Sequence, residues 1–156
     1  IPAGGDEPDI DKNPKFSHKL NFIAEMTKHF SQQQPSRSIL VGDLNIAPLA
    51  EDVWSTRQLR NTVSHTAIER KNLLVLVEQG GWTDSVRAHF GPKEVLFSWW
   101  SYRARDWLAS NRGRRLDHIW VSSDLASKVK AVTIESAMRG VEKPSDHVPL
   151  TITLQP

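Results

Sequence analysis

Ser38-Ile39-Leu40-Val41-Gly42-Asp43-Leu44-Asn45-Ile46-Ala47-Pro48 is the stretch that decides how the rest of the chain is read. Its apolar residues 39–41 predict a short strand that is buried on both faces. Gly42 allows the backbone to turn, and Asp43 and Asn45 follow two positions apart, a spacing that directs both side chains to the same side of an extended segment. A carboxylate and an amide are costly to bury unless something binds them. A metal ion, a phosphate or a hydrogen-bonded turn before Pro48 would each do so.

The composition is that of an ordinary globular domain. The chain has 156 residues, of which 38% are hydrophobic and 24% charged, and this suits one domain with a sizeable core. The absence of cysteine excludes disulfides and thiolate metal sites. No apolar run approaches the roughly 20 residues that a membrane-spanning helix needs. We therefore expect no membrane partner and a cytoplasmic location.

The positive charge is concentrated in one segment. The net charge of +2 is too small to indicate nucleic-acid binding by itself, but five arginines lie between positions 103 and 115 among aromatic residues. Such a segment is either a solvated surface above core aromatics or a surface that contacts phosphates and stacks on nucleotides. The residues are Arg103, Arg105, Arg112, Arg114 and Arg115, with Trp99, Trp100, Tyr102 and Trp107.

Hydrophobic periodicity predicts helices and strands that alternate in an α/β layered fold. Residues 1–15, rich in glycine and proline, indicate an irregular linker. Helices are predicted at 17–30 and 67–79, with a short third helix after Trp82 that Thr83 or Asp84 caps. Strands are predicted at 39–41, 95–100, 115–121, 132–136 and 148–154, and short helical turns at 49–66.

Two further polar clusters interrupt strand-like segments. Asp117 lies within an apolar strand, where an unpaired carboxylate is costly, and a buried ion pair with a nearby arginine is the simplest explanation. Ser145-Asp146-His147 immediately precedes the last strand. A histidine beside a carboxylate can act as a general base, although such pairs also arise by chance.

Taken together, these clusters carry a specific resemblance. Along its whole length the chain resembles the exonuclease III branch of the endonuclease/exonuclease/phosphatase superfamily. The matching segments are Gly42-Asp43-Leu44-Asn45-Ile46-Ala47-Pro48, Phe97-Ser98-Trp99-Trp100-Ser101-Tyr102-Arg103, Asn111-Arg112-Gly113-Arg114-Arg115-Leu116-Asp117-His118 and Pro144-Ser145-Asp146-His147-Val148-Pro149.

The resemblance implies a DNA-repair nuclease that uses Mg²⁺ or Mn²⁺ to cleave duplex DNA beside abasic sites or at 3′ ends. By that likeness Asp43 orients or deprotonates the attacking water, and Asn45 holds the phosphate or the metal. His147 contacts the phosphate or serves as base, while Asp146 fixes its ring and helps to hold the metal. Asp117 supports the histidine. The implied metal ligands are therefore Asp43, Asn45, Asp146 and His147, which suit a hard cation.

The resemblance also assigns DNA contacts. Trp99 and Leu116 fall where the family places an apolar pocket for a flipped abasic sugar, although an ordinary core role for Trp99 is the alternative. Arg103, Arg105, Arg112 and Arg114 would grip backbone phosphates. Arg114 stands where some relatives carry an apolar or aromatic residue.

The likeness is to the C-terminal half of the family's four-layered α/β sandwich, over residues 1–156. It implies a mixed β-sheet of about five or six strands with helices on one face. The principal metal-binding glutamate belongs to the other half and has no counterpart here, so we expect weak metal binding. A homodimer, or the missing N-terminal half, would cover the sheet face that is otherwise exposed.

Two other functions stay open from the sequence. One is a non-catalytic half-domain that dimerises or binds DNA without cutting it. The other is a phosphoesterase of the same superfamily that acts on RNA, phospholipids or inositol phosphates. The segments at 99–103 and 111–117 favour DNA over these substrates.

Overall fold

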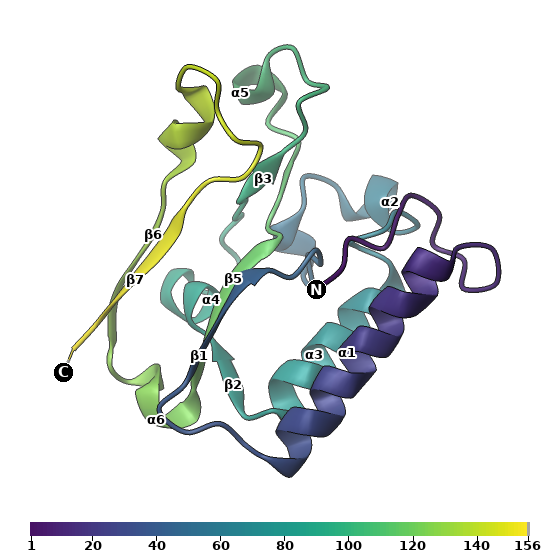
Figure 1. The fold of residues 1–156 in the computed structure, drawn as a ribbon. Helices are drawn as coiled ribbons and strands as arrows, with labels where there is room; N and C mark the ends of the chain where they lie inside the picture. Colours follow the sequence, from purple (N-terminus) through teal and green to yellow (C-terminus); the bar gives the residue numbers. More distant parts are fainter. Residues whose placement is uncertain (156) are drawn as a thin grey trace.

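The computed structural model describes residues 1–155 and has an α/β architecture (Figure 1). In the described part of the chain, no helix is both long enough and apolar enough to cross a membrane. The elements in chain order are α1 (Pro14–Gln32), β1 (Ile39–Asp43), η1 (Ala50–Asp52), α2 (Thr56–Leu59), α3 (Ala67–Gln79), β2 (Trp82–Asp84), α4 (Ser85–Phe90), β3 (Trp99–Trp100), α5 (Trp107–Ser110), β4 (Gly113–Arg114), β5 (Asp117–Ser122), α6 (Ser123–Ala126), β6 (Val129–Ile134), η2 (Ser136–Gly140) and β7 (Leu150–Leu154).

The strands form three small antiparallel sheets, in the orders β1-β5-β2, β3-β4 and β6-β7. The α/β class is thus confirmed, whereas the single mixed sheet of five or six strands is wrong. Loops and helical turns separate the short strands. The three sheets are therefore connected by single backbone hydrogen bonds and bridges, and not by one continuous ladder of strand pairing. Val148 N donates to Ser98 O, and Trp99 forms a β-bridge with His147.

Elements pack on both faces of the central sheet at β5, which corrects the expectation of helices on one face only, although the second face stays exposed at β1. Because side chains alternate along β5, Trp120 faces the helix pair α1 and α3, while Ile119 faces the opposite side. Trp120 packs in a core with Ile23 and Leu76. Ile119 packs with Val86 of α4 and with the hairpin β6-β7. The sheet therefore has a helical layer on one side and a mixed layer on the other (Figure 1).

Local sequence signals explain most helix ends. Asn13 accepts hydrogen bonds from the first-turn amides of α1, so this helix begins at Pro14 and not near Ser17. Thr66 and Glu69 form a capping box at the start of α3, which spans the predicted residues 67–79. Asp84 caps α4 as predicted, but Trp82 belongs to a strand.

Strand β1 is not buried on both faces as its apolar sequence predicts. Leu40 packs against the core below α1, whereas Ile39 is 45% and Val41 65% exposed. β1 is also the edge strand of its sheet. An apolar run cannot tell a central strand from an edge strand, because only the tertiary fold decides which neighbours are present.

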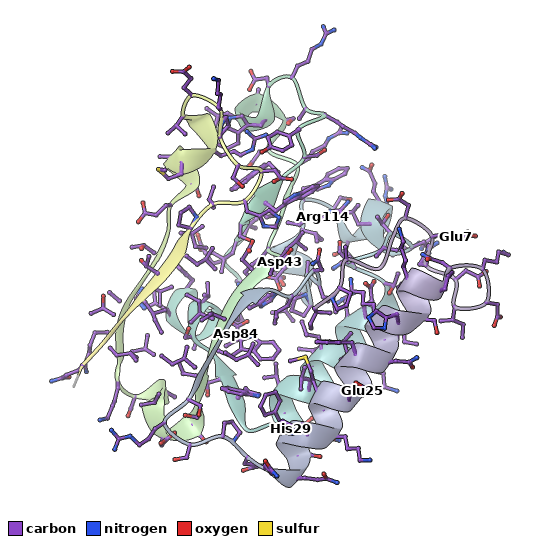
Figure 2. The ribbon with its side chains drawn as sticks, in the orientation of Figure 1. Glu7, Glu25, His29, Asp43, Asp84 and Arg114 are labelled. Atoms are coloured by element: carbon purple, nitrogen blue, oxygen red, sulfur yellow. The ribbon has the colours of Figure 1, made fainter. Side chains whose placement is uncertain are left out.

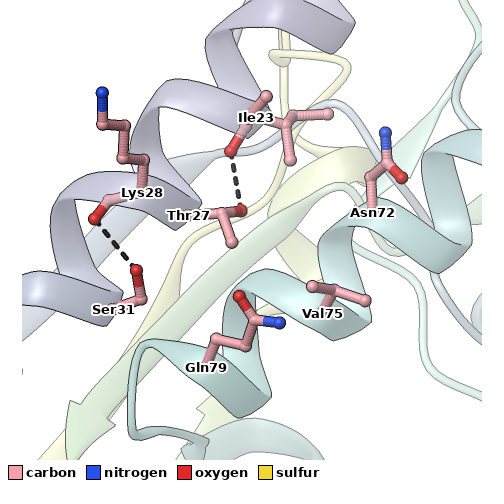
Figure 3. Close-up of a pocket in the computed structure, with 8 residues that line it drawn as sticks. Ile23, Thr27, Lys28, Ser31, Asn72, Val75 and Gln79 are labelled. Carbon is pink, nitrogen blue, oxygen red and sulfur yellow. Dashed lines mark hydrogen bonds between the residues drawn. The ribbon is translucent and has the colours of Figure 1, made fainter.

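A groove of about 430 Å³ lies between α1 and α3 (Figure 3). Its hydroxyl groups are already used within α1, since Thr27 Oγ1 donates to Ile23 O and Ser31 Oγ donates to Lys28 O. Its other polar lining residues are Lys28 of α1 and Asn72 and Gln79 of α3. This lining supplies no carboxylate or imidazole, so the groove does not provide hydrolytic chemistry.

The buried core and the exposed face of β1 predict different losses of stability for two isoleucine substitutions. Ile23→Ala, in the fully buried core of α1, should lower the free energy of unfolding by about 2–5 kcal/mol, because it leaves a cavity. Ile39→Ala, on the exposed side of β1, should cost less than about 1 kcal/mol. Urea denaturation measures both, and equal losses would contradict the exposed placement of β1.

Candidate active site

Three ligand-bearing side chains meet where β1 ends and β5 begins. The strand register sets Asp43 opposite Asp117, and the bridge between Trp99 and His147 brings the segment before β7 to the same place. Ligand atoms of Asp43, Asp117 and His147 all lie within 4.8 Å of one another. Each side chain is partly exposed, so a substrate can reach it. Figure 2 labels Asp43 at the end of β1.

Asp117 orients the imidazole of His147. A carboxylate only accepts, so His147 Nδ1 carries the proton and donates it to Asp117 Oδ2 over 2.8 Å. Ser98 Oγ donates to the same oxygen over 2.7 Å. The hydrogen bond to Asp117 raises the pKa of His147 above its ordinary value, against the opposing effect of burial. Nε2 is left facing Asp43, whose Oδ2 lies 4.0 Å away.

Two interpretations of these residues from the sequence are wrong. Asp117 pairs with His147, as the resemblance implied, and not with an arginine, because the neighbouring Arg115 turns toward other buried carboxylates. Asp146 does not fix the ring of His147, because its Oδ2 accepts from Trp99 Nε1 over 3.0 Å. Asp146 contributes to His147 only through its negative charge.

Asp43 and Asn45 form a hydrogen-bonded turn, one of the three outcomes that the sequence left open. Asn45 adopts a left-handed backbone with a φ of 54°. Its backbone N–H donates to Asp43 Oδ1 over 2.8 Å, and its Nδ2 donates to Asp43 Oδ2 over 2.9 Å and to Ile1 O over 3.0 Å. Both amide hydrogens are thereby used, while Oδ1 of Asn45 accepts no hydrogen bond within residues 1–155.

Buried polar side chains hold the loop that follows Asp43. Lys19 Nζ donates to Asn45 O over 2.7 Å and pairs with Glu69 over 2.6 Å, with both side chains fully buried. Burial lowers the pKa of Lys19, and the charge of Glu69 opposes this effect. The next three carbonyls accept in turn from His118 Nε2 (Ile46 O, 2.9 Å), His65 Nδ1 (Ala47 O, 2.7 Å) and Arg70 Nε (Pro48 O, 2.7 Å).

A second buried network fixes the approach to β5. Arg115 is fully buried and donates to Asp52 over 2.7 Å and to Asp84 over 2.7 Å. These bonds favour the ionised forms of the two aspartates. The charge of Arg115 helps to hold the pKa of Asp84 well below its usual range, although burial by itself would raise that pKa. Because Arg115 is two residues before Asp117, this network fixes where the strand begins.

Sequence reasoning missed these supporting residues. Lys19 lies within the apolar stripe of α1, and a charge at such a position is a signal that a buried partner exists. Glu69 was recognisable as the third residue of a capping box. The pairing between the two could not be read from the chain, because it depends on how α1 packs against α3.

The predicted DNA-contacting residues fall into two groups. Trp99 and the buried Leu116 pack together in one apolar cluster, with the guanidinium of Arg114 lying 5.2 Å from the Trp99 ring centre. Arg103 and Arg112 are exposed and line a separate cavity of about 420 Å³. Arg112 lies 4.7 Å above the ring of Trp54.

The donor set at Asp43 suits a divalent cation. Asp43 and the unused Oδ1 of Asn45 are oxygen ligands of the kind that Mg²⁺ and Mn²⁺ prefer. The side chain of Asp43 is 36% exposed and that of Asp117 is 21% exposed, so Asp43 is the more accessible carboxylate. Of the predicted ligands, Asp43, Asn45 and His147 come together, whereas the side chain of Asp146 is hydrogen-bonded to Trp99.

Comparison with known proteins places this arrangement among nucleases. A model described as the endonuclease/exonuclease/phosphatase family matches residues 20–147. The exodeoxyribonuclease III of Haemophilus influenzae is 32% identical over 143 residues, which cover 87% of this chain and 53% of that protein. The exodeoxyribonuclease of Bacillus subtilis is 33% identical over 137 residues, covering 86% and 49%. The chain thus spans about half the length of these relatives.

Solved structures agree with these relatives. An AP endonuclease from Archaeoglobus fulgidus superposes with a TM-score of 0.87 at 27% identity, over 99% of this chain and 58% of that one. A 3′ phosphatase from Neisseria bound to a product DNA hairpin superposes with a TM-score of 0.87 at 28% identity, over 99% and 59%.

The buried pair behind the loop predicts a strong effect of one substitution. Lys19→Met should lower the free energy of unfolding by about 3–5 kcal/mol, because it leaves Glu69 buried without a partner. The double variant Lys19→Met/Glu69→Gln should recover part of this loss. Urea denaturation measures both, and a single variant as stable as the parent would contradict the pairing.

The contact between Asp117 and His147 predicts a shifted titration. In the metal-free protein the pKa of His147 should lie above the ordinary value of about 6.5, and Asp117→Asn should lower it. Since the folded-state pKa is raised, the stability that this contact contributes is present in full below pH of about 6.5 and is lost as the pH rises through the folded-state pKa.

NMR titration of the histidine ring protons measures this shift. His65, whose pKa burial lowers, is the internal control and should titrate alike in both proteins. A His147 pKa that is unchanged in Asp117→Asn would contradict the assigned contact.

Proposed function

Because the chain belongs to the endonuclease/exonuclease/phosphatase family, we propose that it forms the Asp43–His147 portion of a DNA-repair nuclease that uses a divalent metal. The reaction is hydrolysis of phosphodiester bonds in duplex DNA, beside abasic sites or at 3′ ends. The observation that carries this proposal is the cluster of Asp43, Asp117 and His147, whose ligand atoms lie within 4.8 Å of one another.

The reaction is one displacement at phosphorus. A water oxygen forms a bond to phosphorus, the bond between phosphorus and O3′ breaks, and the electron pair stays on O3′. The water loses one proton and O3′ gains one. The same displacement serves an internal phosphodiester beside an abasic site, the last phosphodiester of a 3′ end and a 3′ phosphate.

Asp43 and His147 take different parts in this displacement. Asp43 accepts the proton of the attacking water or orients that water, since its carboxylate is the accessible acceptor at the end of β1. The raised pKa of His147 favours its protonated form, in which Nε2 donates to a phosphate oxygen and stabilises the developing charge. Asp117 is a positioning residue that acts through His147.

Asn45 contributes an oxygen and not a hydrogen-bond donor. Both hydrogens of its Nδ2 are occupied by Ile1 O and Asp43 Oδ2. Its Oδ1 can therefore accept from the attacking water or bind a cation, and the proposal assigns no phosphate contact to it.

Mg²⁺ or Mn²⁺ would be held by Asp43 and Asn45 Oδ1, with Asp146 as a further candidate ligand. His147, the fourth predicted ligand, could bind a cation only in its neutral form, and donation from Nε2 to phosphate excludes that form. Such a cation neutralises phosphate charge and lowers the pKa of bound water. The chain's own residues then fix the geometry, because the buried bonds of Lys19 and Arg115 hold both ends of the site.

We further propose that the exposed side of β1 is covered in the working nuclease. Ile39 and Val41 are exposed there on an edge strand, and the relatives are about twice as long as the matched region. A segment equivalent to the rest of those relatives is the occupant that this length favours, and a second copy of this chain is the alternative.

A non-catalytic role, DNA binding without cleavage, is the second candidate. The observation that favours it is the match to only about half of the length of the relatives. It predicts affinity for DNA that falls with salt, with no turnover that depends on Mg²⁺.

Nicking of a synthetic abasic duplex tests the proposal. With Mg²⁺ the chain should nick the duplex, and EDTA should abolish this activity. Asp43→Ala should lower the rate at least about a thousandfold, since removing one member of a catalytic unit removes most of its effect. RNA and a phosphoinositide serve as comparison substrates.

The controls separate the candidates. Glu25→Ala removes an exposed carboxylate of α1 that lies away from Asp43 (Figure 2), and it should leave nicking unchanged. A second arm adds the N-terminal half of the Haemophilus influenzae exodeoxyribonuclease III in trans. DNA binding without nicking in both arms would contradict the nuclease proposal and favour the second candidate.

A further inference from the structure

Arg114 differs from the exposed arginines of its segment, Arg103, Arg105 and Arg112, in how firmly it is held. Its Nη1 donates to Ser64 Oγ over 2.7 Å and to Val63 O over 3.3 Å. The guanidinium lies over the indole of Trp99, opposite Arg114 in the strand register. A solvated arginine that merely grips backbone phosphates needs none of these contacts.

In the described part of the chain no carboxylate pairs directly with Arg114, and Glu69 acts on it only through its charge. Within residues 1–155 Arg114 forms no ion pair, its Nε is buried without a hydrogen-bond partner, and its Nη2 makes no hydrogen bond. Burial lowers the pKa of Arg114, but an arginine pKa is high enough for the group to stay charged at neutral pH. Its Nη2, which is not among the buried unpaired atoms, is therefore the part of the guanidinium that can bind an anion.

This cation stands beside the proposed active site. Trp99 pairs with Arg114 on one side and with His147 on the other, so the backbones of Arg114 and His147 are about 10 Å apart, two strand spacings. Trp99 in turn packs, together with Trp54, against a buried apolar cluster that consists of Ala47, Val53, Leu59 and Leu116.

We propose that Arg114 is a specificity-determining residue that makes the surface at Trp99 favour a DNA 3′ end carrying a phosphate monoester over a neutral abasic sugar. This inference rests on the proposed function and names its preferred substrate. A neutral sugar would cover the guanidinium without supplying a charged acceptor, and an uncompensated buried donor is costly. A phosphate monoester supplies oxygens for charge-assisted hydrogen bonds.

The preferred reaction is balanced as removal of one phosphate. The oxygen of water bonds to phosphorus, the bond from phosphorus to O3′ breaks, and O3′ takes up a proton. The products are a 3′ hydroxyl and inorganic phosphate. No oxidant or further reactant is needed.

Two duplexes and three variants test the role of Arg114. One duplex carries an abasic site and the other a nick with a 3′ phosphate, and kcat/KM is measured on each with Mg²⁺. Arg114→Leu should shift the ratio of 3′ phosphate removal to abasic nicking by about ten- to a hundredfold toward the abasic substrate. Arg114→Lys keeps the charge but not the planar fork, and should lie between.

Arg112→Leu is the matched control, since Arg112 also lies over a tryptophan but is exposed. It should lower both activities together, with their ratio changed less than twofold. Far-UV circular dichroism checks that each variant is folded. A ratio that Arg114→Leu leaves unchanged, while both activities are measurable, would overturn the inference.

A DNA-binding measurement tests the role of Arg114 even if the chain has no turnover. In EDTA, the affinity for the nicked duplex with a 3′ phosphate is compared with that for the same duplex with a 3′ hydroxyl, by fluorescence anisotropy. The parent should prefer the phosphate about tenfold, and Arg114→Leu should lose the preference. No preference in the parent would overturn the inference, whereas a preference without any turnover would count only against the proposed nuclease.

Discussion

The buried ion pair between Lys19 and Glu69 holds the loop on which the candidate site depends. One end of this pair binds the carbonyl of Asn45, and the other binds the amides of Ser64 and Thr66. Two helices and two loops are thus tied at one point. Removing two charges from water is costly, so such a pair is a poor source of net stability. Its effect is geometric, because it places Asp43 and Asn45 at a defined position beyond β1.

A second set of buried charges does the same for the other strand. Arg115 connects η1, the end of β2 and the approach to β5 through Asp52 and Asp84. The site therefore lies between two buried networks: the Lys19–Glu69 pair holds the loop after Asp43, and the Arg115 network holds the segment before Asp117. His147 enters from a third segment, and its ring is held by Asp117 from below. This design agrees with a site that needs accurate placement of a water and a phosphate.

The two faces of β1 have different environments. Leu40 faces the core and fixes the strand, while Ile39 and Val41 face outward on an edge that is open in this chain. The chain belongs to the endonuclease/exonuclease/phosphatase family and matches about half of each relative, and the proposal that another segment covers this apolar edge rests on that match. Arg114 shows that the neighbouring surface is not a purely apolar pocket, because a guanidinium with no directly paired carboxylate in residues 1–155 lies against Trp99.

The sequence by itself determined the α/β class, the helix at 67–79 and the identity of the cluster residues. Helix caps and periodicity are local, and the spacing of Asp43, Asn45, Asp117 and His147 along the chain carries the family resemblance. The resemblance implied that Asp117 supports the histidine, but only the tertiary structure decided that Asp146 does not fix its ring, that β1 is an edge, and that the strands form three antiparallel sheets. These features depend on contacts between segments far apart in the chain, and no local pattern encodes which buried charge meets which partner.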